Sequence, residues 1–284
     1  MVLGVGYIAI AWVYASIAMS GRITDGAVPV IDGVIEEAVT LTNGDVDLAA
    51  GFYANPDDGS CAVVLIHGID ADRSDILGFA PLYWNLGCSV FAFDHRDHGR
   101  SAAAHRTYGF HESADAQLAI EWVLGKTGLA PDHVGLHGVS FGAATSLEVL
   151  DKRDDLAFIV ADSPYSSMAG ILSASAGDTL SRLEPVFRPL AFFLIERRAG
   201  IEIGKVDPAD AVVGKSTPIL VMHTAGDTIV PVDHSERVAA ANPAIERHVI
   251  DADGLHIHAY RLRTAEYTTI VHDFIARTVP DFVP

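Results

Sequence analysis

The sequence reads GVSFG at residues 138–142. This segment lies at the end of a short predicted strand, 134–138, and it opens a stretch, 141–150, that has the pattern of a helix. A serine flanked by glycines at a strand-to-helix turn indicates a nucleophile elbow, in which a tight turn lifts the hydroxyl above a sheet. An accidental glycine-rich turn is the alternative, but the position between strand and helix favours a nucleophile. We therefore predict that Ser140 is the reactive residue.

Apolar runs alternate with helical patterns on both sides of this segment. Such runs suit strands that are buried on both faces of a parallel sheet and covered by helices. We expect strands at 62–66, 90–93, 134–138, 158–161, 219–222 and 247–250. We expect helices at 76–86, 113–124, 141–150 and 258–278. Ahead of them, Asn-Gly at 43–44 separates two β-rich runs, 37–42 and 46–53, and predicts a hairpin at the edge of the sheet.

A long insertion, 164–213, interrupts this alternation between the strands 158–161 and 219–222. Connections of this length are usually functional lids or caps. The insertion carries Phe187, Phe192 and Phe193, which favour an apolar cap over a binding site. Simple cover over the edge of the sheet is the alternative.

A serine hydroxyl is a weak nucleophile and needs a base and an acid that orients the base. In this architecture the chain order is serine, acid, base, and each follows a strand. Asp227 follows the strand 219–222, and His256 follows the strand 247–250. Because catalytic groups gather at the carboxyl edge of a parallel sheet, we predict a triad of Ser140, Asp227 and His256.

For both Asp227 and His256 the sequence offers an alternative residue. Asp162 also follows a strand, but its Asp-Ser-Pro context is typical of an aspartate that fixes a turn. His258 lies two residues after His256, and we place it on the first turn of the closing helix. The two histidines could instead ligate a metal, but no third ligand stands at a zinc-site spacing. We therefore predict no metal site.

Acyl transfer also requires N–H donors for the oxyanion that develops on the substrate. We expect one donor to be the backbone N–H of Phe141, which follows the nucleophile. The second should come from the turn after the first parallel strand, where Ile69 is the candidate and Gly68 permits a close backbone approach. We expect His67 to line the site without transferring a proton.

The N-terminal segment, 1–21, is strongly apolar and carries no charged side chain. About 20 helical residues span roughly 30 Å, the thickness of the hydrocarbon core of a bilayer. We expect a single-pass membrane anchor, followed by an acidic linker, 22–36, and a catalytic domain, 37–284. The alternatives are a cleaved signal peptide, which would make the protein secreted but lacks a basic n-region, and a helix packed on the domain.

The 284 residues carry a net charge of −18 at pH 7, and 50% of them are hydrophobic. A chain in which half of the residues are hydrophobic is not mostly disordered. The acidic surface repels phosphate backbones, so we expect no nucleic-acid partner. Glycine-rich nucleotide-binding patterns are not found at a strand-to-helix turn, and we expect no cofactor.

The sequence resembles the α/β-hydrolase superfamily in its serine-nucleophile branch. Within that branch it resembles most of all the monoacylglycerol-lipase and serine-aminopeptidase-like group. The resemblance covers roughly 37–278 and rests on LIHG at 65–68, 93–101, GVSFG, DSPY at 162–165 and the Asp227 and His256 segments. It implies an eight-stranded, mostly parallel sheet with helices on both faces and a helical cap between strands 6 and 7.

That group commonly has Asp-x-Arg-Gly-x-Gly-x-Ser after its fourth strand, and here Asp97 replaces the first glycine. We expect Asp97 to be solvated, and we do not assume the usual backbone conformation there; the alternative is that Asp97 faces the substrate. The resemblance also makes the strands that start near Cys61 and Cys88 neighbours, with both thiols at the same level. A disulfide between them would be geometrically awkward, so we expect buried reduced thiols.

The ordered triad and the resemblance predict a serine hydrolase that cleaves an ester of an apolar acyl or alkyl group through an acyl-enzyme. A serine peptidase, a thioesterase or an acyltransferase with the same triad is the alternative. A membrane-tethered binding module without catalysis is another. The partners we expect are a small apolar ester and, through residues 1–21, the membrane.

Overall fold

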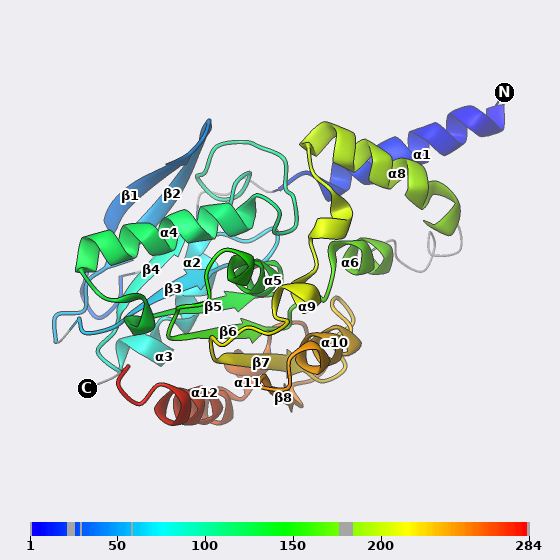
Figure 1. Cartoon of the computed structure of the whole chain (residues 1–284). Coiled ribbons are helices and arrows are strands. Elements are labelled where there is room, and N and C mark those ends of the chain that lie inside the picture. The colour runs from blue at the N-terminus through cyan, green and yellow to red at the C-terminus, as the bar shows by residue number, and fades with distance from the viewer. Residues whose placement is uncertain (1, 22–25, 29, 58, 176–183, 283–284) are drawn as a thin grey trace.

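The computed structural model describes residues 2–21, 26–28, 30–57, 59–175 and 184–282. Parts of the predicted linker (22–25 and 29) and of the predicted cap (176–183) lie outside the described residues. In the described part of the chain, eight strands form one sheet in the order β1-β2-β4-β3-β5-β6-β7-β8 (Figure 1). The predicted mostly parallel α/β-hydrolase sheet is confirmed.

An antiparallel hairpin, β1 (Glu37–Asn43) and β2 (Val46–Tyr53), forms one edge of this sheet. The remaining strands run parallel to one another, and they begin and end close to where the sequence predicts them. They are β3 (Ala62–Ile66), β4 (Ser89–Phe93), β5 (Val134–Val139), β6 (Phe158–Asp162), β7 (Ile219–Thr224) and β8 (Glu246–Ile250). Every residue of β3 to β7 is buried, which explains their nearly continuous apolar runs.

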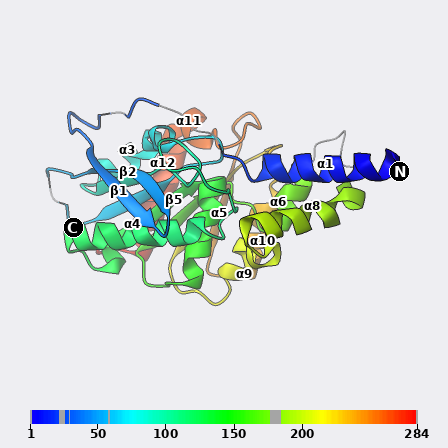
Figure 2. The ribbon, with the colours of Figure 1, turned by 90° about the horizontal axis from the view of Figure 1, so that it is seen from above.

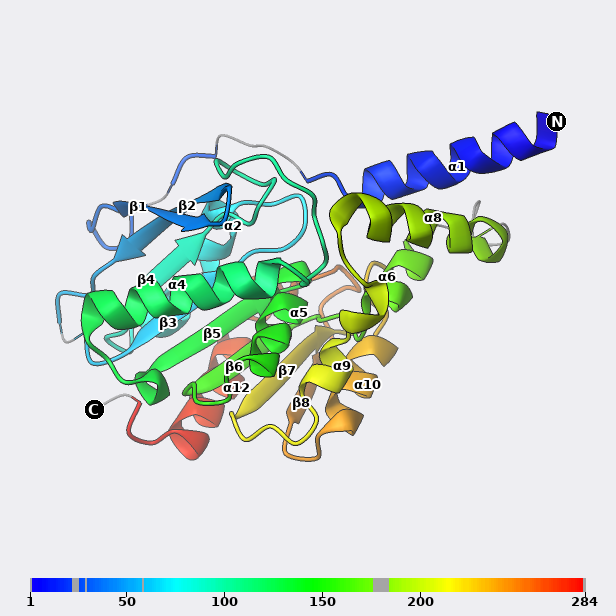
Figure 3. The same ribbon diagram turned by 45° about the horizontal axis from the view of Figure 1, so that its top comes forward.

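Helices pack on both faces of the sheet (Figure 3). They are α2 (Arg73–Ile76), α3 (Pro81–Trp84), α4 (Glu112–Thr127), α5 (Phe141–Glu148), α10 (Asp233–Ala241), α11 (Ala259–Leu262) and α12 (Thr264–Thr278). Successive strand residues face opposite sides: Val63 packs with α2, α3 and α12, whereas Val64 packs with α4, α5 and α10. Short 3₁₀ turns occur at Leu77–Phe79, Pro131–His133, Val149–Asp151 and Ile203–Lys205.

Two predicted helices are divided in the structure. The helix that we expected at 76–86 is split because Pro81, which has no N–H to donate, starts a new helix. The closing helix expected at 258–278 is split at Arg263, whose backbone (φ −130°, ψ 43°) leaves the helical region. Neither division moves a strand end, so the predicted carboxyl edge of the sheet is unaffected.

The cap between β6 and β7 contains α6 (Met168–Ala174), α8 (Glu184–Ala199) and α9 (Pro208–Ala211). The N-terminal helix α1 (Val2–Ala18) lies along α8, and the two extend together away from the sheet (Figures 1 and 2). The rings of Tyr14 and Phe187 pack between them, with centroids 5.4 Å apart.

Helix α1 is the segment for which we predicted a membrane anchor. Over the ranges that the structure describes, no helix combines the length and the apolar character needed to cross a bilayer. The predicted transmembrane helix is therefore not supported. The structure shows the alternative arrangement, in which α1 packs on the rest of the chain.

Asp97 is half-buried, whereas we expected it to be solvated. Its φ of +60° is the left-handed backbone conformation that a glycine would take. Its half-buried carboxylate accepts a hydrogen bond from the N–H of Gly21, with 2.6 Å between nitrogen and Oδ2. Asp97 thus keeps the glycine-like turn and joins it to the segment that follows α1.

The prediction of reduced cysteines is wrong, because Cys61 and Cys88 form a disulfide. They directly precede Ala62 and Ser89, which are paired residues of the neighbouring strands β3 and β4. Their Cα atoms are 4.6 Å apart, within the range that a disulfide needs. The bond therefore connects the starts of two adjacent parallel strands.

Removing this disulfide should destabilise the fold. The cysteines are separated by 27 positions, and the chain-entropy model gives about 3 to 4 kcal/mol for closing a loop of this length. We expect the double variant Cys61→Ser/Cys88→Ser to unfold at a lower urea concentration than the oxidised protein. Reduced wild type should match the double variant, and identical midpoints for oxidised and reduced wild type would contradict the prediction.

Candidate active site

Ser140 occupies a strained turn between β5 and α5, with φ 53° and ψ −115°. The flanking positions have no room for a side chain. A Cβ at Gly138 would lie 2.2 Å from the carbonyl oxygen of Gly142, and a Cβ at Gly142 would lie 2.1 Å from that of Ile66. The structure therefore holds Ser140 in an elbow at the end of β5 and the start of α5.

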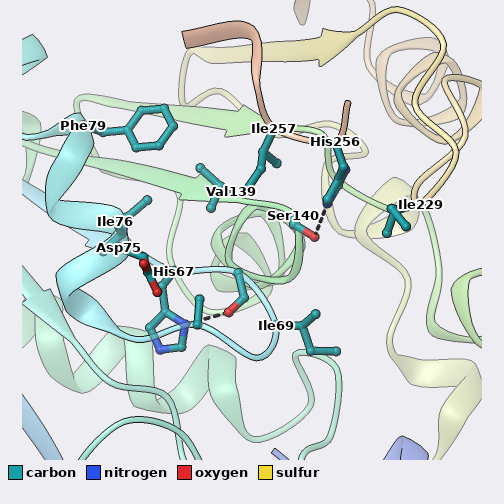
Figure 4. Close-up of a pocket in the computed structure, with 12 residues that line it drawn as sticks. His67, Ile69, Asp75, Ile76, Phe79, Val139, Ser140, Ile229, His256 and Ile257 are labelled. Carbon is teal, nitrogen blue, oxygen red and sulfur yellow. Dashed lines mark hydrogen bonds between the residues drawn. The ribbon is translucent and has the colours of Figure 1, made fainter. Parts of the chain in front are cut away.

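A continuous chain of hydrogen bonds joins the serine to a histidine and an aspartate. The Ser140 hydroxyl donates to Nε2 of His256, with 2.7 Å between the two atoms (Figure 4). The Nδ1–H of the same ring donates to Oδ2 of Asp227 at 2.5 Å. The three residues come from the ends of β5, β8 and β7, so the parallel sheet brings together positions far apart in the sequence.

Asp227 is held as a carboxylate. It accepts hydrogen bonds from the N–H groups of Ile229 at 2.8 Å and Val230 at 3.0 Å. Burial favours the neutral acid, but hydrogen bonds from His223 and His256 outweigh it and hold the pKa of Asp227 well below its usual range. The ionised carboxylate can therefore fix the tautomer of His256.

His223 is a supporting residue that the sequence analysis missed. It is fully buried in β7, and its Nε2 lies 2.9 Å from the carbonyl oxygen of Val230 and 3.5 Å from Oδ2 of Asp227. A histidine inside an otherwise apolar strand, four positions before the predicted acid, is the sequence signal that points to it.

The alternative candidates for the acid and the base, Asp162 and His258, lie outside this chain of hydrogen bonds. The Asp162 carboxylate is buried and accepts from the hydroxyls of Ser163 at 2.9 Å and Tyr267 at 3.1 Å. His258 precedes α11, and Nη2 of Arg261 lies 3.3 Å from its Nδ1. The structure thus joins to Ser140 the two residues that we preferred.

The candidate oxyanion donors lie on either side of the serine. Phe141 begins α5, and the turn containing Ile69 passes beside the nucleophile, since a Cβ at Gly68 would be 3.5 Å from the Cβ of Ser140. Among the described residues, neither the Ile69 nor the Phe141 N–H donates a hydrogen bond. Both groups are free to meet an oxygen of a substrate.

His67 lines the site but is held by the backbone around it. Its Nδ1 lies 2.7 Å from the carbonyl oxygen of Gly68, and its Nε2 accepts from the N–H of His95 at 2.9 Å. Burial, reinforced by the neighbouring His98, lowers the pKa of His67 to about 3. The neutral ring fixes the turn that carries Ile69.

The pocket in front of Ser140 is small and mostly apolar (Figure 4), with a volume of about 120 Å³. Its apolar walls are Ile69, Ile76, Phe79, Val139, Ile229 and Ile257. A cavity of about 150 Å³ is large enough for benzene, so this pocket suits a short apolar group. In the parts of the chain that the structure describes, no three His, Cys, Asp or Glu side chains are placed to hold a metal ion.

The fold and the site together define a serine hydrolase with the α/β-hydrolase fold. The prolyl oligopeptidase family matches residues 95–243, just over half of the chain. The chain belongs to this family. The predicted membership of the serine branch of the α/β hydrolases is thereby confirmed.

The chain is similar to proteins of known and unknown activity. It is 27% identical to the uncharacterised protein YqkD of Bacillus subtilis (strain 168), over 79% of this chain and 74% of that protein. It is 22% identical to the lysophosphatidylserine lipase ABHD12 of Danio rerio, over 69% of this chain and 52% of that one.

Solved structures confirm the fold. The esterase Pf2001 of Pyrococcus furiosus superposes with a TM-score of 0.72 at 21% identity, covering 92% of this chain and 99% of that one. The acylaminoacyl peptidase of Pyrococcus horikoshii superposes with a TM-score of 0.64 at 13% identity, covering 86% and 42%.

The strain at Ser140 can be measured as stability. A sparsely populated backbone conformation with positive φ costs a residue with a side chain about 1 to 3 kcal/mol, whereas glycine adopts it readily. Ser140→Gly and Ser140→Ala both remove the hydroxyl, so their difference isolates the backbone. We expect Ser140→Gly to be more stable than Ser140→Ala by about 1 kcal/mol in urea unfolding, after the extra chain entropy of glycine is subtracted. A Ser140→Gly variant that is less stable than Ser140→Ala by the roughly 0.4 to 1 kcal/mol of glycine's extra chain entropy would show that the turn is not strained.

Proposed function

We propose that this serine hydrolase cleaves esters with an apolar acyl or alkyl group, by way of an acyl-enzyme. The observation that carries the proposal is the chain of hydrogen bonds from Ser140 through His256 to Asp227, which opens onto an apolar pocket. This arrangement supports nucleophilic attack by a serine on a carbonyl carbon.

In the proposed mechanism His256 accepts the proton from Ser140 as Oγ attacks the ester carbonyl. Asp227 keeps the ring in the tautomer that leaves Nε2 free, and it stabilises the imidazolium that forms. The N–H groups of Ile69 and Phe141 bind the oxyanion. His256 then protonates the departing alcohol, and in the second half-reaction it activates the water that releases the acid.

The lining of the pocket supports an apolar substrate group. Apart from the reacting residues, its walls are mainly branched aliphatic and aromatic side chains. The one carboxylate among them, Asp75, accepts a hydrogen bond from the N–H of Asp72 at 3.2 Å as part of the cap of α2. A neutral ester group therefore fits this pocket better than a charged one.

Peptide hydrolysis is the second candidate, and membership of the prolyl oligopeptidase family favours it. A thioester would react through the same three residues. The binding-module alternative has less support, because all three predicted residues are present and hydrogen-bonded.

An activity-based probe tests the nucleophile. A fluorophosphonate should label the wild type at Ser140 and leave Ser140→Ala unlabelled. The wild type should hydrolyse p-nitrophenyl esters, and Ser140→Ala should lose several powers of ten in kcat. Labelling that persists in Ser140→Ala would refute the assignment. Turnover of an acylated peptide p-nitroanilide without any ester turnover would transfer the proposal to the peptidase.

Matched substitutions test the acid. Asp227→Asn places an amide opposite Nδ1 of His256, which favours the wrong tautomer, and we expect kcat to fall about 10³- to 10⁴-fold. Asp162→Asn makes the same change at the end of the neighbouring strand β6, outside the chain of hydrogen bonds. It should cost less than about tenfold in kcat. Equal losses in the two variants would contradict the role of Asp227.

A further inference from the structure

A second cavity, of about 270 Å³, shares the lining residue Ile69 with the pocket in front of Ser140. Helix α1 forms one wall of it through Tyr14, Ile17 and Ala18. The opposite side is formed by Leu172 of α6 and by Ser175, which follows that helix. The N-terminal helix, which is not part of the sheet or of its covering layers, therefore borders a space next to the site.

Ile69 lines both this cavity and the pocket in front of Ser140. In Figure 4 it lies on the side of Ser140 away from Phe79. The end of α1 reaches the same region, since Ala18 and Met19 pack in one buried cluster with Phe141. The two cavities are thus neighbours across Ile69, whose N–H is a candidate oxyanion donor.

The α1 wall is attached to the domain at several points. The buried guanidinium of Arg106, which also lines the cavity, donates to the carbonyl oxygens of Ala18 at 2.9 Å and Ile17 at 3.1 Å. The Arg106 N–H donates to the carbonyl oxygen of Met19 at 3.0 Å. Further up the helix, the Tyr14 hydroxyl donates to the carbonyl oxygen of Leu172. These bonds fix α1 against the loop that carries Arg106 and against α6 of the cap, so the cavity is a built part of the fold.

We propose that this second cavity holds the far end of the alkyl chain of the ester, and that α1 thereby sets the chain length that the enzyme prefers. The inference rests on the proposed function. The pocket at Ser140, at about 120 Å³, is smaller than the cavity of about 150 Å³ that binds benzene, so it holds fewer than about six carbon atoms. A longer chain must continue past Ile69, and the neighbouring cavity, whose aliphatic lining includes Ile17, Ala18 and Leu172, receives it.

A matched pair of tryptophan substitutions on α1 tests this inference. Ile17 lines the cavity, whereas Ile8 lines neither this cavity nor the Ser140 pocket. Both side chains are exposed, by 67% for Ile17 and 57% for Ile8, so the full chain should fold with either change. The probes are ethyl and dodecyl fluorophosphonates, and the readout is the ratio of their labelling rates at Ser140.

We expect Ile17→Trp to lower the dodecyl-to-ethyl ratio about tenfold, which corresponds to about two methylene groups that are no longer buried. Ile8→Trp should leave the ratio unchanged. An unchanged ratio in Ile17→Trp, or an equal fall in both variants, would overturn the inference while the proposed function stands. Absence of labelling by either probe in the wild type would overturn the proposed function and this inference with it.

Discussion

The backbone of Ser140 is closely packed against neighbouring elements: it lies between β5 and α5, next to the end of β3 and the end of β6. Its left-handed turn is possible only because Gly138 and Gly142 place hydrogen atoms where side chains would collide with the backbone, including the end of β3 at Ile66. The Ser140 N–H donates to the carbonyl oxygen of Asp162 at 2.7 Å, which ties the turn to β6. This single constraint aims the hydroxyl above the sheet, starts α5 and leaves the N–H of Phe141 without a partner in the described chain.

The positions of the reacting groups depend on this turn and on neighbouring groups that take no part in the reaction themselves. Asp227 stays ionised because two backbone N–H groups and two histidines outweigh the cost of its burial. The neutral ring of His67 braces the turn that carries Ile69. The strain at one residue is therefore compensated by many satisfied hydrogen bonds around it.

The N-terminal helix and the cap complete the surroundings of the site from outside the sheet. Apolar packing between α1 and α8 is accompanied by polar contacts between distant segments. Arg106 closes the end of α1, and the carboxylate of Asp97 receives the N–H of Gly21. An arginine buried against helix carbonyls is satisfied by hydrogen bonds, so it fixes the position of the helix as well as covering apolar surface. The −18 net charge of the chain is consistent with a solubility role.

Local patterns in the sequence were sufficient to predict the strands, the elbow at Ser140 and the order of Asp227 and His256, because a parallel sheet brings the carboxyl ends of its strands to one edge. The same patterns could not assign Cys61 and Cys88, the backbone of Asp97, the place of α1 or the support from His223. Each of these depends on a partner far away in the chain. Apolar residues at 1–21 suit a bilayer or a protein surface equally well, and the sequence alone does not show the packing of α1 against α8. Periodicity and motif order were thus readable from the chain alone, whereas the disulfide, the ionisation of Asp227 and the second cavity arose from long-range contacts.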